Sequence, residues 1–183
     1  SEAEKIEERL KRVVEKLRRD ATRVRKHTDD LVKEITDLAE ESKRRVEEIR
    51  ERVKRLRERV TDKDTVRKLV EEIKKRLDDS DKTLEDLVER IERLLEENLK
   101  DSERLVTEIE KELRRLLEEV RRLDEKVVKR LEDEVKRIKD EAKEMVDENK
   151  RKVDEIRKEL RRLVEENRRE SEKIKKKLDE DLK

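Results

Sequence analysis

Hydrophobic residues return along this chain in steps of three and four positions, which is the spacing of one face of an α-helix. The first round of this pattern visits Val13, Leu17, Ala21, Val24, Thr28 and Leu31. Such a round takes 18 residues, from Val13 to Leu31, and similar rounds start at Leu69 and Val127. Eighteen residues in five turns give about 3.6 residues per turn, the value of a straight α-helix, whereas a strict heptad repeat forces a left-handed supercoil. The pattern therefore predicts long, nearly straight helices.

Each round opens with two adjacent hydrophobic residues. The pairs are Val13-Val14, Leu31-Val32, Leu69-Val70, Leu87-Val88, Leu105-Val106, Val127-Val128, Met145-Val146 and Leu163-Val164. The second residue of each pair widens the apolar stripe beyond the two positions per heptad of a simple coiled-coil seam. A stripe of this width indicates a helix that packs against two neighbours.

The pattern loses phase twice, and we expect the chain to turn at these two places. It restarts at Leu69, two residues late, and again at Val127, four residues after Leu123. Asp62 and Asp124 stand just before the restarts, and aspartate is a favoured residue at a helix N-cap. The slips and the caps together divide the chain into three helices.

We expect an all-α fold, an up-down-up antiparallel bundle that forms a single domain over 1–183. The predicted helices cover about 1–61, 62–123 and 124–183, each roughly 90 Å long at 1.5 Å per residue. Ser1 and Glu4 have the spacing of a capping box at the first helix start. The stretch 77–83 is polar enough for a turn, but the 18-residue pattern passes through it without a slip, so we expect helix there. Short loops between neighbouring helices favour the antiparallel arrangement.

Polar residues at core positions fall into two groups. At equal height in such a bundle, residue numbers add up to about 125 between the first two helices and about 247 between the last two. The first group is Thr28, Asn98 and Asn149, with Thr22 and Ser102 nearby, and the second is Ser42, Ser80 and Asn167, with Ser171 one turn on. We interpret them as two buried polar layers that fix the helix register, because a buried amide without partners costs about 1–3 kcal/mol. The alternative places some of them at the margin of the stripe, in contact with water.

Composition restricts the function further. Charged residues make up 62% of the chain, and glycine, proline, cysteine and aromatic residues are absent. The 57 basic and 56 acidic residues alternate within each turn, so no basic face for nucleic acid is expected. No apolar run approaches the roughly 20 residues of a membrane span. We therefore expect a soluble protein, cytoplasmic if expressed in a cell, that requires neither nucleic acid nor membrane.

No constellation of residues indicates catalysis, a cofactor or a metal. His27 is the single histidine, and one imidazole cannot supply a histidine-rich zinc site. It is interpreted as a boundary residue, solvated or donating a hydrogen bond to the Thr28/Asn98 layer. Acidic pairs such as Asp29-Asp30 and basic pairs such as Arg18-Arg19 are interpreted as solvated surface, and Met145 as core. The sequence therefore predicts no enzyme.

The 18-residue register, the Asn/Ser layers and the Lys/Arg/Glu/Asp surface together resemble de novo designed helical bundles with buried hydrogen-bond networks. The resemblance covers the whole chain and rests on the repeat starts and polar layers given above. It implies a stable scaffold with no evolved ligand, catalytic residue or compartment. We expect a monomer that needs no partner. The alternative is a coiled-coil interaction protein whose stripes form a bundle with other chains, and a homo-oligomer is also open.

Overall fold

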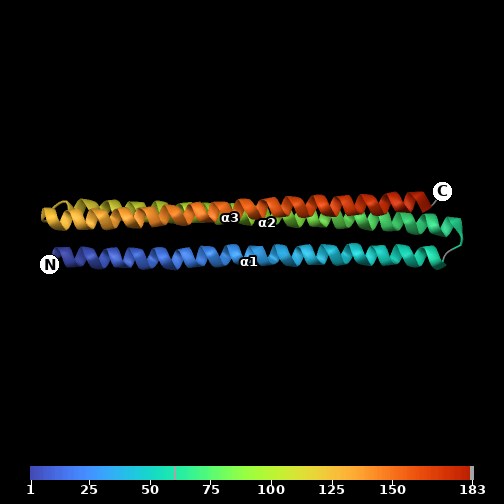
Figure 1. Cartoon of the computed structure of the whole chain (residues 1–183), viewed down its shortest axis with the longest axis horizontal. Coiled ribbons are helices and arrows are strands. Elements are labelled where there is room, and N and C mark those ends of the chain that lie inside the picture. The colour runs from blue at the N-terminus through green and yellow to red at the C-terminus, as the bar shows by residue number, and fades with distance from the viewer. Residues whose placement is uncertain (60, 182–183) are drawn as a thin grey trace. The chain divides into compact units, whose positions relative to one another are not determined.

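The computed structural model describes residues 1–59 and 61–181, which form three long α-helices (Figure 1). The helices are α1 (Glu2–Arg59), α2 (Lys63–Val120) and α3 (Glu125–Asp181). Neither described range contains a β-strand. The predicted all-α, three-helix architecture is confirmed, and α2 continues without interruption through 77–83.

Side chains of the residues that precede α1 and α2 cap these helices. The Ser1 hydroxyl oxygen accepts a hydrogen bond from the Glu4 backbone N–H at 3.4 Å. One carboxylate oxygen of Asp62 accepts from the Asp64 N–H at 3.4 Å, and the other accepts from the Thr65 hydroxyl at 2.8 Å. The bonds from the Glu4 and Asp64 N–H groups satisfy donors that lack a partner within the helix.

The end of α2 lies three residues before the predicted boundary, at Val120. The N–H groups of Arg122 and Leu123 bond the carbonyls three residues earlier, at 3.3 and 2.9 Å, which tightens the last turn into a loop. Leu123 still packs, half-buried, against the hydrophobic core. Asp124 then starts α3 through its carbonyl, which accepts from the N–H groups of Val127 and Val128 at 3.0 and 2.9 Å. The apolar register therefore runs beyond the helix itself.

Tertiary contacts divide the chain into two compact units, and each unit contains one segment of every helix. The first unit comprises Ser1–Asp30 and Leu94–Glu155, and the second comprises Leu31–Arg93 and Ile156–Lys183. The expectation of a single domain over 1–183 stays a prediction. The two units are described separately below.

In the first unit, α1 and α3 run in the same direction and α2 runs the opposite way. The cross-helix pairs are Arg9 with Glu119 and His27 with Asn98 between α1 and α2, and Glu7 with Arg130 and Arg25 with Glu148 between α1 and α3. Along α1 the partner number falls on α2 and rises on α3. This is the predicted up-down-up order.

The core of the first unit is closely packed. Leu10, Leu113 and Leu131 keep 1%, 0% and 0% of their surface exposed and belong to one hydrophobic cluster. Burying such a side chain contributes about 1.5–3 kcal/mol. The wide apolar stripe of each helix therefore provides most of the stability of this unit.

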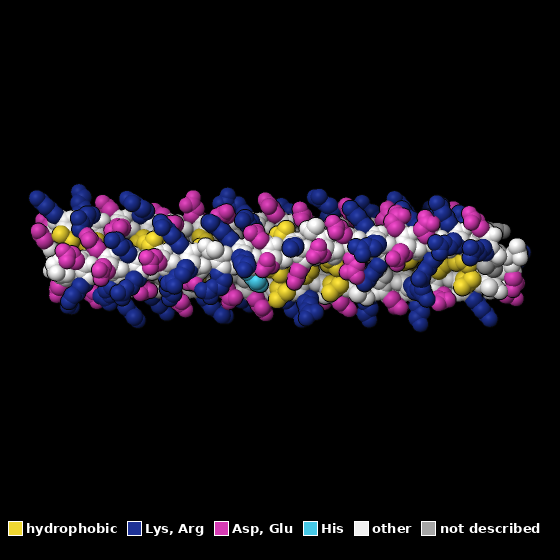
Figure 2. Space-filling model, turned by 90° about the horizontal axis from the view of Figure 1, so that it is seen from below, with side chains coloured by type: hydrophobic (Ala, Val, Ile, Leu, Met, Phe, Trp, Pro, Cys, Tyr) yellow, Lys and Arg dark blue, Asp and Glu magenta, His cyan; other side chains and the backbone are white. Residues whose placement is uncertain are grey.

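In the second unit the same helix order holds, but α1 is less deeply buried. The cross-helix pairs are Ser42 with Asn167 and Arg50 with Glu170 between α1 and α3, and Lys74 with Asp179 and Glu85 with Arg168 between α2 and α3. On α1, Val46, Ile49 and Leu56 are only partly buried, and Val32 is 40% exposed. Figure 2 shows hydrophobic side chains at the surface between charged ones. The α1 segment of this unit therefore leaves apolar surface open to solvent.

Candidate functional site

The first polar layer, defined here as Thr28, Asn149, Asn98 and His27, connects all three helices of the first unit. The Thr28 hydroxyl donates to Asn149 Oδ1 at 3.0 Å, and Asn149 Nδ2 donates to Asn98 Oδ1 at 2.9 Å. Asn98 Nδ2 lies 2.7 Å from His27 Nδ1. Thr28, Asn98 and Asn149 are buried, at 1%, 2% and 5% exposure, whereas His27 is exposed. The layer is thus a chain of hydrogen bonds that runs from the core to the solvent.

The donors and acceptors of this chain fix its direction. Asn98 uses its carbonyl oxygen to accept from Asn149, so its Nδ2 donates to the ring of His27. His27 Nδ1 must then be the unprotonated ring nitrogen, and the ring carries its proton on Nε2. The single hydroxyl proton of Thr28 has two acceptors in reach, Asn149 Oδ1 at 3.0 Å and the Val24 carbonyl at 2.9 Å, and it serves one at a time.

The second polar layer, defined as Ser42, Asn167, Asp81 and Ser171, lies in the second unit. The Ser42 hydroxyl donates to Asn167 Oδ1 at 2.7 Å, and Asn167 Nδ2 donates to Asp81 Oδ1 at 2.7 Å. The same carboxylate oxygen accepts from the Ser171 hydroxyl at 2.8 Å. This layer also joins three helices, but its last acceptor carries a charge.

Burial raises the pKa of the Asp81 carboxyl group above its ordinary value, because a low-dielectric environment disfavours the charged form. The hydrogen bond from Ser171 and the positive charge of Lys175 lower the pKa, but by less. Lys175 bonds Asp78, and this bond raises the pKa of the Lys175 ammonium and keeps it charged beside the layer. The second layer therefore holds a carboxylate in a half-buried, partly compensated position.

Six of the nine residues predicted for the layers take part in these cross-helix bonds. They are Thr28, Asn98 and Asn149 in the first layer, and Ser42, Asn167 and Ser171 in the second. These residues find partners on other helices for two reasons. They lie at equal heights along the helices, and an amide side chain can bridge two neighbours at once.

The other three predicted residues bond elsewhere or not at all. Thr22 is exposed and donates to the Arg18 carbonyl of its own helix at 2.8 Å. Ser102 is fully buried, yet its hydroxyl donates to the Leu99 carbonyl at 2.8 Å. Ser80 is half-buried and forms no cross-helix hydrogen bond within the described part of the chain. A serine or threonine in a helix readily satisfies itself on a carbonyl of the preceding turn, so it needs no partner on another helix.

Sequence reasoning missed Asp81. Asp81 replaces its neighbour Ser80 in the second layer, because a step of one residue turns a helix by about 100° and here brings residue 81 to α3. The signal was present in the spacing of Lys74, Asp78, Asp81 and Glu85, steps of four, three and four that mark the edge of α2 beside the core. His27 is exposed, in agreement with a solvated boundary residue, and within the layer it accepts a hydrogen bond from Asn98, whereas the alternative expectation had it donating.

The polar groups of the two layers bond one another across the helices. Every buried side-chain nitrogen and oxygen of the described residues has a hydrogen-bond partner, so no donor or acceptor points at a vacant site. Among the same residues, no group of three or more His, Cys, Asp or Glu side chains could hold a metal ion. The carboxylates of Asp29 and Asp30 and the guanidinium groups of Arg18 and Arg19 are exposed, and Met145 is 7% exposed in the core.

None of the helices, over its described residues, combines the length and hydrophobicity that crossing a membrane requires.

Comparison with known proteins finds similarity among solved structures alone. No protein-family model matches the chain, and no curated protein matches it. Among solved structures, it is similar to a computationally designed three-helix bundle, at 17% sequence identity and a TM-score of 0.44. The match covers 98% of this chain and 82% of that chain.

Proposed function

We propose that this protein is a designed structural scaffold, without a natural biochemical activity, whose role is to fold into one defined three-helix arrangement. The observation that supports this most is the first polar layer. Its buried groups, Thr28, Asn149 and Asn98, bond one another across three helices. The hydrophobic core provides stability, and the layers select the register.

The energetic reason is the cost of leaving a buried amide unpaired, about 1–3 kcal/mol per group. Sliding one helix by a turn, about 5.4 Å, would separate both amides of the first layer from their partners. The hydrophobic contacts alone discriminate less well between registers, since the apolar stripe repeats along each helix. A set of fully paired buried polar groups is what such a scaffold requires, and the described residues have it.

A coiled-coil protein that binds other chains is the second candidate. The partly exposed apolar residues on α1 of the second unit favour it, with Val32 at 40% exposure as the clearest case. We favour the monomer, because the polar groups of both layers find their partners within one chain.

Light scattering coupled to size-exclusion chromatography distinguishes the monomeric scaffold from the interaction protein. A scaffold that folds by itself has a mass near 22.5 kDa at every concentration. A multiple of that mass, or a mass that rises with concentration, would support the interaction protein instead.

A second experiment tests the role of the layer. The double variant Asn98→Leu/Asn149→Leu removes both amides together, so we expect unfolding free energy equal to or above that of the parent. A short bifunctional thiol reagent that bridges Arg25→Cys and Glu148→Cys, whose parent side chains pair at 3.5 Å, reports register. The parent background should give one cross-linked product, and the leucine background should also cross-link in shifted pairs such as Arg25→Cys with Lys152→Cys. A single register in both backgrounds contradicts the proposal.

A further inference from the structure

A groove of about 320 Å³ lies between α1 and α2 in the second unit. Its floor is apolar and includes Leu56, Leu69 and Ile73, of which Leu56 and Leu69 are partly buried. Because these side chains pack less closely than the core of the first unit, they leave a hydrophobic strip open to solvent. We call this feature the arginine groove, for the residues of its rim.

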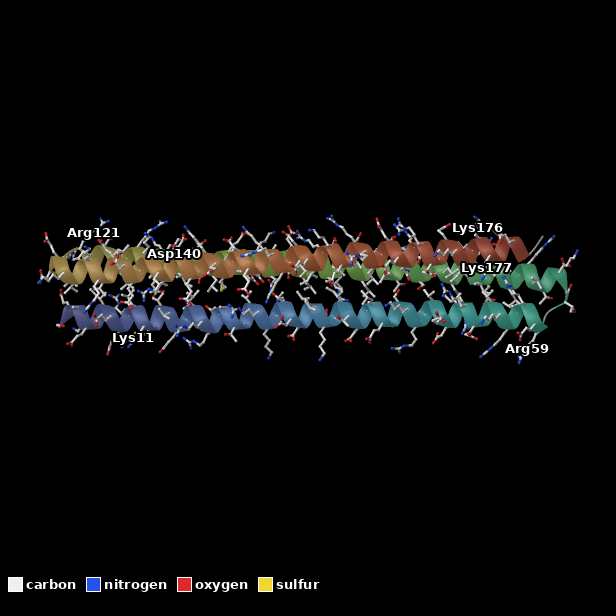
Figure 3. All side chains as sticks on the ribbon, in the orientation of Figure 1. Lys11, Arg59, Arg121, Asp140, Lys176 and Lys177 are labelled. Carbon is white, nitrogen blue, oxygen red and sulfur yellow. The ribbon has the colours of Figure 1, made fainter. Side chains whose placement is uncertain are left out.

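One rim of the arginine groove carries three cations in a row. Arg52, Arg55 and Arg59 follow one another on α1 at helical spacing and are all exposed, and Arg59 lies at the end of that helix (Figure 3). None of the three forms an ion pair with any described residue. The opposite rim, on α2, has Glu72 and Arg76, which pair with each other at 3.2 Å. The groove therefore combines an apolar floor with a rim of uncompensated positive charge.

A groove in the first unit lacks this combination. It lies between α1 and α3 in the first unit, has a volume of about 840 Å³ and contains Leu17 and Met145. Its cations and acids are equal in number: Arg18, Arg25, Arg151 and Lys152 against Glu141, Glu144, Glu148 and Glu155. Arg25 and Glu148 also pair across it at 3.5 Å. We call it the balanced groove, and it serves as an internal control.

We propose that the arginine groove binds a single-chain anionic amphiphile, an alkyl carboxylate, with the tail on the apolar floor and the head group among the guanidinium groups. Guanidinium is planar and presents paired N–H donors that match the two oxygens of a carboxylate. The tail removes apolar surface of Leu56, Leu69 and Ile73 from water, which favours binding. The property is independent of the scaffold role and goes beyond it.

The dimensions of the groove favour an alkyl chain over an amphipathic helix. Its α1 side extends from Ile49 to Arg59, about 15 Å at 1.5 Å per residue. A helix is about 10–12 Å across with its side chains and needs a wide platform along several turns. A single alkyl chain fits a short, narrow strip with charges along one edge.

Calorimetric titration of dodecanoate, kept below its micelle concentration, tests the proposal. We expect saturable binding of one molecule per chain that weakens with added salt, since the rim charges are exposed. Shortening the probe to decanoate should weaken binding about fifteenfold, because each buried methylene contributes about a factor of four. Equal binding of dodecyltrimethylammonium would overturn the proposal, as would tighter binding of an acidic amphipathic peptide.

Matched variants locate the site. The triple variant Arg52→Gln/Arg55→Gln/Arg59→Gln should bind dodecanoate about tenfold more weakly, because each exposed charge contributes modestly. The control Arg18→Gln/Arg25→Gln/Arg151→Gln, which removes as many charges from the balanced groove, should bind like the parent. Equal losses in both variants would mean a general charge effect and would overturn the proposal.

Methyl NMR gives a readout that does not depend on affinity. Dodecanoate should shift the methyl resonances of Leu56, Leu69 and Ile73 and leave those of Leu17 unchanged. Shifts centred on Leu17, or on Val53 and Ile174 in the neighbouring α1–α3 groove, would place the ligand elsewhere and contradict the assignment.

Discussion

Neutral groups make up the first polar layer, whereas the second contains a carboxylate. In the first layer the amides of Asn98 and Asn149 are 2% and 5% exposed, and the chain of bonds reaches water only at His27. In the second, Asp81 is half-buried, and Lys175 lies near enough to lower its pKa. The difference shows that depth limits the choice of polar group: a deep layer requires neutral groups that satisfy one another, while a layer near the surface can include a charge.

The burial of apolar residues on α1 also differs between the two units. In the first unit, α1 buries Ile6, Leu10, Val13 and Leu17 to 5% exposure or less. In the second unit, several apolar residues of α1 are only partly buried, Leu56 among them. Substitutions at matched positions of the two units can test whether burial sets the energetic weight of a residue.

The largest effect is expected from a charge placed in the deeper core. Leu10→Asp, on α1 of the first unit, should lower the free energy of unfolding by about 3–5 kcal/mol, because it buries an unpaired carboxylate at a position with 1% exposure. Leu56→Asp should cost about 1 kcal/mol, since its side chain still reaches water. Urea denaturation followed by circular dichroism measures both. Equal losses would show that the two units are packed alike.

A medium effect is expected from removing the central amide of each layer. Asn149→Ala leaves the Thr28 hydroxyl and the Asn98 oxygen without their shared partner in a buried place, and should cost about 2–3 kcal/mol. Asn167→Ala removes the corresponding bonds to Ser42 and Asp81, and should cost about 1 kcal/mol because water can replace them. Chemical denaturation measures the loss of unfolding free energy in each variant. A larger loss for Asn167→Ala than for Asn149→Ala would contradict the expected order of the two layers.

Acid should distinguish the charged layer from the neutral one. Because the pKa of Asp81 is raised in the folded state, the folded protein holds this proton more tightly than the unfolded chain. The resulting stabilisation is fully present below the ordinary value of 3.8 and is lost as the pH rises through the folded pKa. The unfolding free energy of the parent, minus that of Asp81→Asn, should therefore fall with rising pH across this window.

Asp79→Asn, an exposed position on the same turn of α2, is the control for net charge in this series. A difference for Asp81→Asn that stays constant with pH, or rises, would contradict the role of burial at Asp81.

The smallest effect is expected at the solvent end of the first layer. His27→Lys replaces the acceptor of Asn98 Nδ2 by a donor and should cost about 0.5 kcal/mol, since water can take over at this exposed position. His27→Gln, which keeps an acceptor oxygen, should be closer to the parent. In nitrogen NMR spectra of the neutral ring, a proton on Nδ1 in place of Nε2 would contradict the described direction of the hydrogen bonds.

Periodicity predicted most of the fold because the spacing of hydrophobic residues along each helix indicates where that helix begins and ends. The two phase slips located both loops within a few residues, and the cap at Asp62 was recognisable from its type and place. The end of α2 was placed three residues late, because Leu123 continues the apolar pattern in a loop that still packs on the core. A hydrophobic pattern records burial, and burial does not require a helix.

The composition of the polar layers was harder to predict, for a reason of geometry. Residue numbers give height along a bundle, so Asn98 and Asn149 could be paired, but the direction of a side chain around its helix decides between neighbours such as Ser80 and Asp81. Hydroxyl groups add a second difficulty. Those of Thr22 and Ser102 bond carbonyls of their own helices, and nothing in the sequence distinguishes them from Thr28, whose hydroxyl reaches both kinds of acceptor.

Neither compact unit is a continuous stretch of the chain, and this has a consequence for biosynthesis. The first unit needs Ser1–Asp30 together with residues as far as Glu155, and the second needs Leu31–Arg93 together with the residues from Ile156 onward. A nascent polypeptide leaving the ribosome therefore cannot finish either unit until its third helix emerges. Until then, a two-helix hairpin exposes its hydrophobic stripe to solvent, which favours association with chaperones or with other nascent chains.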